Sequence, residues 1–259
     1  MNLQTTTEQD LLRDSAGKFL ASCCDYQSFQ KITAAEPGWS AERWAEFAEL
    51  GWLGLPFAEE HGGFGGGPVE TAILMEAFGR HLVTEPFVST VILGGGLVAA
   101  LGSASQREAL LTPLMEGRLQ LALAGGMGAT ITARRSGANH VLSGTCPMVP
   151  GAAGADQLLV AATLTDGGTG VWVLPRSTPG LRLAPCMLVN GARAADVTLD
   201  AVSVPASTLL GDNENAADAV ALVIDRAIAA LSADAVGALS AIVTTTVEYT
   251  KRSEEHTSE

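Results

Sequence analysis

The chain has 259 residues, 47% of them hydrophobic and 17% charged, and its 15 basic and 28 acidic residues give a formal net charge of −13. This apolar content excludes an intrinsically disordered chain, and the length allows one large domain or two modest ones. The acidic balance disfavours nucleic acid and anionic membrane surfaces as partners, because both attract positively charged proteins.

The ends of the chain and the cysteines indicate the compartment. Residues 1–10 are polar and lack the basic and apolar segments of a signal peptide. The longest apolar run, residues 87–101, is shorter than the ~20 residues that cross a bilayer. The adjacent Cys23 and Cys24 are read as helix-face residues in preference to a redox pair, because disulfides are rare in the cytosol. We therefore expect a soluble, cytoplasmic protein without membrane contact.

The N-terminal part predicts an all-α domain over residues 1–118. A capping box at Thr7 and Asp10 begins a helix over residues 7–24. Ser40 caps a second helix, which ends at Gly51.

Three more helices follow in this part. Pro68 begins a helix that extends to about Leu82, and Ser105 caps another. Between them, a helix from Pro86 runs through three consecutive glycines at 94–96, each costing about 1 kcal/mol relative to alanine. We interpret these glycines as a tight helix–helix crossing in preference to a ligand site.

The pattern changes at Gly117 to short runs rich in Val, Thr and Leu, which predict an antiparallel β-barrel or sandwich over residues 119–212. The predicted strands are 121–124, 129–133, 140–143, 157–163, 170–174, 181–183, 195–199 and 202–204. Helical periodicity resumes near Ala216, and residues 225–250 predict one long buried helix. The predicted fold class is α+β.

Two stretches carry a resemblance to a known family. These are LGWLGLPFAEEHGGFGGG at residues 50–67 and EAFGRHLVTEPFVST at residues 76–90. They resemble the N-terminal helical domain of the acyl-CoA dehydrogenase family. The resemblance spans residues 8–252 and implies that residues 213–252 form the first helix of a truncated C-terminal four-helix bundle. The polar residues 253–259 are predicted to be a non-native tail.

The resemblance also implies flavin chemistry, in which FAD accepts a hydride from the β-carbon of an acyl-CoA while a carboxylate removes the α-proton. The family binds its flavin through a Thr-Glu-Pro strand end, an Ala-Gly-Ser-Asp loop and a Trp-Ile-Thr strand. At the first position this chain has Leu123, Ala124, Gly125 and Gly126, and at the second it has Met148, Val149 and Pro150. Neither position keeps the family's hydroxyl or acidic groups, and Pro150 lacks an N–H group. The resemblance therefore implies FAD as cofactor with weakened or abolished affinity.

Asp225 is the candidate for the catalytic base, because Asp225-Arg226 falls where one branch of the family has a Glu-Arg pair. The alternative reading, which we favour, is a helix-start acid paired with its neighbouring arginine. No metal-ligand spacing is present.

Two functions remain open on the sequence. The first is an acyl-CoA dehydrogenase, an oxidoreductase acting on CH–CH groups in fatty acid or steroid side-chain β-oxidation. Its partners would be an acyl-CoA, an electron-transfer flavoprotein or similar acceptor, and further subunits. The second is a catalytically reduced subunit that completes a hetero-oligomer with an active homologue.

Overall fold

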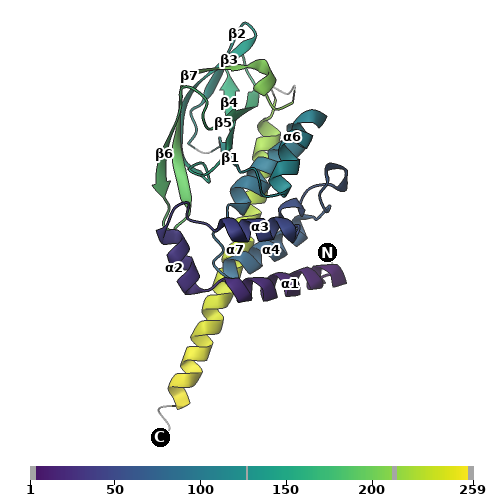
Figure 1. The fold of residues 1–259 in the computed structure, drawn as a ribbon, viewed down its shortest axis with the longest axis vertical. Helices are drawn as coiled ribbons and strands as arrows, with labels where there is room; N and C mark the ends of the chain where they lie inside the picture. Colours follow the sequence, from purple (N-terminus) through teal and green to yellow (C-terminus); the bar gives the residue numbers. More distant parts are fainter. Residues whose placement is uncertain (1–3, 127, 212–214, 256–259) are drawn as a thin grey trace. The chain divides into compact units, whose positions relative to one another are not determined.

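The computed structural model describes residues 4–126, 128–211 and 215–255 of the chain. The predicted boundary at 212/213 and the end of the predicted tail, residues 256–259, lie outside these ranges. Figure 1 shows the helices and strands of the chain, coloured in sequence order. The chain forms two compact units. The first contains residues 1–31, 67–83 and 228–259, and the second contains residues 32–66 and 84–227. The domain boundaries 118/119 and 252/253 remain predictions.

In the first unit, helices α1 (Thr7–Cys23) and α4 (Pro68–Arg80) pack together. Thr6 caps α1 by accepting the Gln9 N–H at 3.2 Å, while the Gln9 side chain accepts the Thr6 N–H at 2.9 Å. The capping box therefore begins one residue before the predicted Thr7. Gln9 Nε2 also donates to Glu70 Oε1 at 2.7 Å, which links the two helices. This hydrogen bond lowers the pKa of Glu70.

The same unit contains most of the long helix α7 (Ala217–Glu255), which crosses α4 at two glycines. A Cβ atom on Gly79 would lie 1.8 Å from the Asp234 carbonyl oxygen. A Cβ atom on Gly237 would lie 1.9 Å from the Glu76 carbonyl oxygen. The two helix backbones therefore touch, and only glycine fits at either position.

The long helix exists as predicted, but the prediction that it is buried is wrong. Its exposed apolar side chains recur at helical spacing: Ile228, Leu231, Val236, Leu239, Ile242, Val243 and Val247. Among the described residues, one segment, Ala217–Lys251 of α7, is long and apolar enough to cross a membrane on those two criteria alone.

The remaining helices are short, and their bounds are α2 (Tyr26–Ala34), α3 (Ala41–Glu49), η1 (Trp52–Gly54), η2 (Glu59–His61), η3 (Val88–Gly95), α5 (Gly96–Leu101) and α6 (Ala104–Met115). All of them except α2, which contains the 31/32 division, belong wholly to the second unit. Ser40 caps α3 as predicted, accepting the Arg43 N–H at 3.3 Å, and Gly51 follows with φ 76°. Ser103, not the predicted Ser105, caps α6. Helix α2 was not predicted.

The predicted helix from Pro86 is a π-helix, η3, followed by α5. A Cβ atom on Gly94 would lie 2.5 Å from Leu121 Cβ, and one on Gly95 would lie 2.4 Å from the Phe57 ring. One on Gly96 would lie 3.1 Å from Val223 on α7. The glycines therefore permit tight packing as predicted, and two of them face other helices, since a Cβ atom on Gly95 would also lie 3.2 Å from Leu114 on α6.

The described residues of the second unit also form seven strands: β1 (Leu121–Ala124), β2 (Thr132–Ser136), β3 (Asn139–Pro150), β4 (Gln157–Leu164), β5 (Thr169–Pro175), β6 (Leu181–Met187) and β7 (Arg193–Pro205). A short 3-10 turn, η4 (Ala206–Thr208), follows. The strand order is β1-β4-β2-β3-β7-β6, with β5 also paired to β4. Strands β1 and β2 both run parallel to β4, so the sheet is mixed and not purely antiparallel as predicted.

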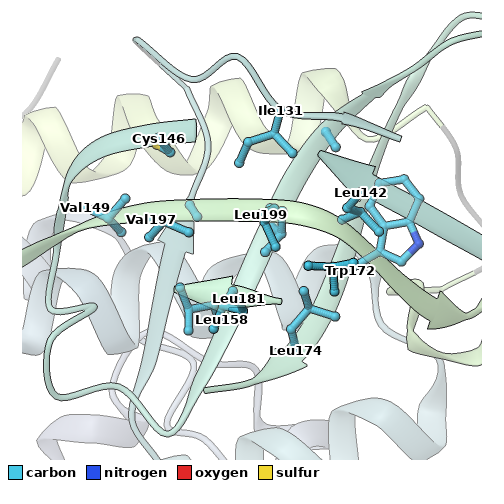
Figure 2. Close-up of a cluster of buried hydrophobic side chains, with 14 of the residues drawn as sticks. Ile131, Leu142, Cys146, Val149, Leu158, Trp172, Leu174, Leu181, Val197 and Leu199 are labelled. Carbon is cyan, nitrogen blue, oxygen red and sulfur yellow. The ribbon is translucent and has the colours of Figure 1, made fainter. Parts of the chain in front are cut away.

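The sheet curls around an apolar interior to which most of its strands contribute (Figure 2). Leu142, Leu158 and Trp172 are fully buried there, from β3, β4 and β5. Alternating inward residues such as Val197 and Leu199 on β7 give the period-two pattern of a half-buried strand. This core holds the ends of β1 and β3, where the candidate site lies.

Candidate functional site

The two stretches aligned with the family's flavin contacts meet at one end of the sheet. Strand β1 ends at Ala124 and leads into Gly125 and Gly126. The Gly125 N–H group hydrogen-bonds to the thiol of Cys146, which lies on β3 two residues before Met148. Leu123, Gly125, Gly126, Met148, Val149 and Pro150 therefore belong to one region, within a single compact unit.

Cys146 joins the two stretches but is not a reactive thiol. Burial raises its pKa, and the nearby carboxylate of Asp196 raises it further, while the Gly125 amide opposes both effects. A raised pKa keeps the thiol protonated, and the thiolate is the nucleophilic form. Cys146 is therefore a buried packing residue that receives one hydrogen bond.

The first stretch is shaped by close backbone approach. Leu123 is buried, and a Cβ atom on Gly125 would lie 2.6 Å from Ala161 Cβ on β4. Gly126 has φ +87°, and a Cβ atom there would lie 3.0 Å from Ile224 Cδ1 on α7. These glycines are explained by packing, and they offer no side-chain donor to a ligand.

In the second stretch, Met148 and Pro150 point outward and Val149 points into the core. Met148 has φ +49° and is 61% exposed, whereas Val149 is 2% exposed. The positive φ occurs where the β3–β7 register shifts between Cys146 and Val149. Such a bulge re-aims side chains, and here it turns the Met148 thioether to the surface.

Two backbone positions of this stretch are poorly placed to donate a hydrogen bond to a ligand: the Met148 N–H group is already hydrogen-bonded, and Pro150 has no N–H group. Met148 N donates to Asp196 Oδ1 on β7 at 2.7 Å. Sequence reasoning missed Asp196, because β7 carries several polar residues and nothing in the local pattern distinguishes Asp196 from the others.

A flavin needs polar partners along the edge of its isoalloxazine ring, and these residues do not fit that need. None of the six named side chains carries an O–H, N–H or carboxylate group. The Asp196 carboxylate adds an acceptor and a negative charge beside the stretch. The region as it stands therefore offers a flavin little beyond apolar contact.

Asp225, the candidate base, lies near the start of α7 and is exposed. Its neighbour Ile224 is the α7 residue that faces Gly126. Adjacent residues on a helix do not share a face. The prediction that Asp225 acts as base stays a prediction.

Similarity to known proteins agrees with the resemblance read from the sequence. A family model described as "Acyl-CoA dehydrogenase, N-terminal domain" matches residues 6–118. Acyl-CoA dehydrogenase FadE12 of Mycobacterium tuberculosis is 31% identical over 227 residues, which cover 81% of this chain and 58% of that protein. Probable acyl-CoA dehydrogenase YngJ of Bacillus subtilis is 28% identical over 270 residues, covering 97% of this chain and 70% of that protein.

A solved structure shows the same likeness in three dimensions. The Tcur3481-Tcur3483 steroid ACAD G363A variant superposes with a TM-score of 0.81 at 30% identity, covering 93% of this chain and 66% of that chain. The present chain thus spans between 58% and 70% of the length of these three proteins. The helical N-terminal region, the curled mixed sheet and the C-terminal helix occur here in the order of that family. This chain belongs to the acyl-CoA dehydrogenase family.

Proposed function

We propose that this protein takes part in the α,β-dehydrogenation of an acyl-CoA thioester, as a subunit of an assembly whose flavin is bound by a homologous partner subunit. Family membership supports the reaction class, because the acyl-CoA dehydrogenases related to this chain are oxidoreductases. The observation that carries the role is the hydrogen bond from Met148 N to Asp196 Oδ1, next to a proline that has no N–H.

The energetic argument for a reduced role follows from that site. Each lost hydrogen bond to a ligand costs about 1 kcal/mol, and more where a buried polar atom stays unpaired. The losses fall in both flavin stretches at once, so they add to a large decrease in affinity. For this reason we assign no flavin step to the residues of this chain.

The resemblance to a heteromeric enzyme is consistent with this role. The Tcur3481-Tcur3483 steroid ACAD is named for two components. A fold that keeps its shape can still complete a shared assembly when its own ligand contacts are lost. The shape here is well maintained, since Asp156 Oδ2 accepts the Gln120 N–H at 2.8 Å and holds the start of β1.

A second candidate is a dehydrogenase that binds its own FAD, and the ordered frame of the sheet favours it. The Gly125 amide and the Met148 amide both lie in this region, and backbone groups need no particular side chain to contact a flavin. In that case the Asp196 hydrogen bond would have to break when FAD binds.

The visible absorption spectrum separates the two candidates. The full-length gene product, purified alone, should be colourless, and flavin should co-purify only when a homologous dehydrogenase subunit is co-expressed. A yellow protein that bleaches when an acyl-CoA is added would instead establish the second candidate. In that protein, Asp225→Asn should abolish turnover without loss of flavin if Asp225 is the base, and unchanged turnover would assign the base elsewhere.

A further inference from the structure

The end of helix α1 brings together two thiols that the regular helix pattern would keep apart. Residues at positions i and i+1 of a helix project in different directions and do not face each other. Cys23 is the last residue of α1, whereas Cys24 has φ −121° and ψ 109°, an extended conformation. This change of backbone conformation turns the Cys24 side chain toward Cys23. The two Sγ atoms lie 3.6 Å apart, in contact as a thiol–thiol pair.

The sequence favoured helix-face residues over a redox pair here, but Cys24 lies outside the helix and its thiol contacts that of Cys23. We propose that Cys23 and Cys24 form a reversible redox site that closes to a vicinal disulfide. The site lies where α1 ends and α2 begins, within one compact unit of the chain. It rests on neither the flavin stretches nor the proposed dehydrogenation.

The two thiols differ in access, which assigns their roles. Cys23 is partly exposed and Cys24 is 8% exposed. The more accessible thiol reacts first with an oxidant, here hydrogen peroxide. The Cys23 thiolate attacks one peroxide oxygen, the O–O bond breaks, and Cys23 becomes a sulfenic acid while the other oxygen leaves as water after taking up a proton. The Cys24 thiolate then attacks the Cys23 sulfur, the S–O bond breaks, and a second water leaves after protonation.

Geometry makes the product easy to reduce. An S–S bond is about 2.05 Å long, so the sulfurs must approach from their present 3.6 Å. Neighbouring Cα atoms across a trans peptide are about 3.8 Å apart, below the roughly 4.4–6.8 Å usual for a disulfide. A strained disulfide has a more oxidising potential, which is typical of labile and regulatory bonds. The pair therefore closes under peroxide and reopens with a mild thiol.

The local structure around the pair limits what the change disturbs. Cys24 N donates to Leu20 O at 2.8 Å and closes the last turn of α1. Cys23 Sγ lies 3.4 Å from Phe19 O, to which it donates. Oxidation removes both thiol protons and with them the Cys23 donor. The change therefore acts on the final turn of α1, where the Cys23 thiol donates to Phe19 O.

Peptide mapping of the intact chain tests the proposal directly. Trypsin releases residues 19–31, which contain Cys23 and Cys24, while Cys146 and Cys186 fall in the separate peptides 136–176 and 183–193. After one equivalent of hydrogen peroxide and capping of remaining thiols, peptide 19–31 should lose two hydrogens in mass and accept no cap. A mild thiol should restore both caps. Sulfinic acid in this peptide without the internal disulfide would overturn the proposal, as would preferential oxidation of either other peptide.

Two variants and a second probe keep the test specific. Cys24→Ser should stop the reaction at the Cys23 sulfenic acid, which dimedone captures, and Cys186→Ser should leave the result unchanged. Phenylarsine oxide should add once to peptide 19–31 of the unoxidised wild-type protein, losing one water as it binds both thiols. If both thiols are needed, phenylarsine oxide should add to neither Cys23→Ser nor Cys24→Ser. Addition to either variant as strongly as to the wild type would contradict a paired site.

Discussion

At the scale of single residues, the second unit depends on a buried ion pair. Arg43 Nε lies 2.8 Å from Glu85 Oε1, with side-chain exposures of 7% and 0%. The same carboxylate accepts the N–H groups of Ser40 at 3.1 Å and of Thr84 at 3.2 Å. Glu85 thus fixes the start of α3 to the segment that leads into η3.

Removing the carboxylate charge should therefore be severe. Glu85→Gln removes the carboxylate charge that faces the buried Arg43 guanidinium, and we expect a loss of about 3–5 kcal/mol in the free energy of unfolding, measured by urea denaturation. Asp166→Asn is the matched control, because its exposed pair with Arg135 at 3.2 Å should contribute less than about 1 kcal/mol. Equal losses in the two variants would show that burial does not decide the outcome.

His81 gives the first unit a pH dependence. Burial lowers its pKa from the ordinary 6.5, and the charge of Arg80 lowers it further. The unfolded chain then binds the proton more readily, so stability falls as the pH drops through 6.5 toward the folded pKa. His81→Gln should remove the histidine's contribution to the fall in unfolding free energy between pH 8 and pH 5.5. This contribution is under about 1 kcal/mol because the side chain is partly solvated. The measurement is urea denaturation of both proteins at each pH.

One other group in this unit titrates with the opposite sign. Burial raises the pKa of Asp234 above 3.8, so its contribution to stability is present in acid and is lost as the pH rises through the raised value. This contribution is common to wild type and His81→Gln and cancels in the comparison. A larger acid loss in the variant than in the wild type would contradict the role given to His81.

At the scale of elements, glycines decide how closely helices approach. Gly237→Ala would drive a Cβ into the Glu76 carbonyl oxygen, 1.9 Å away, and backbone cannot yield there cheaply. We expect a loss of about 1–3 kcal/mol or more, measured by thermal or urea unfolding. Gly17→Ala on α1 is the control, because nothing lies within 4 Å of its added Cβ. That change should stabilise by up to about 1 kcal/mol through helix propensity. Loss in both variants would point to backbone effects unrelated to the crossing.

The sequence pattern correctly predicted elements whose bounds depend on neighbouring residues in the chain. Strand β1 has the predicted bounds, and β4 extends one residue beyond its prediction, because both are short apolar runs bounded by turn residues. Helix α1 begins at Thr7 as predicted, but its capping box was misplaced by one residue because Thr5, Thr6 and Thr7 offer three equivalent hydroxyl groups. Helix α2 was missed although Asp25 caps it by accepting the Ser28 N–H at 2.7 Å, because the helix buries no residue and so lacks the core-facing apolar positions that identify a helix in a sequence.

Features that depend on distant segments could not be predicted in this way. Residues 195–199 and 202–204 form one strand, β7, because pairing with β3 carries it across Ala201 at φ 49°. The parallel pairing of β1 and β2 with β4 follows from how the chain returns to the sheet, not from any local run. The candidate site likewise combines residues that the sequence located with a partner from a distant segment. The family resemblance located Met148 and Pro150, but the acceptor of the Met148 amide lies 48 residues along the chain.

At the scale of the whole molecule, the exposed face of α7 should govern behaviour in solution. Ile228, Leu231, Leu239 and Ile242 form an apolar stripe along the helix, and all are more than half exposed. An apolar stripe of this length favours association, because removing apolar surface from water stabilises the associated state by a free energy of about 25 cal/mol per Å².

We expect the 259-residue chain to self-associate and to bind a hydrophobic dye, as measured by light scattering coupled to size exclusion and by dye fluorescence. Leu239→Lys with Ile242→Glu should reduce both signals, because the two charges interrupt the stripe at positions that are both exposed. Lys18 and Glu8 are already exposed charges on α1, so Lys18→Glu with Glu8→Lys is a control that alters charge placement alone. A wild-type chain that runs as a monomer, melts cooperatively and leaves the dye dark would show that the stripe is covered within the molecule.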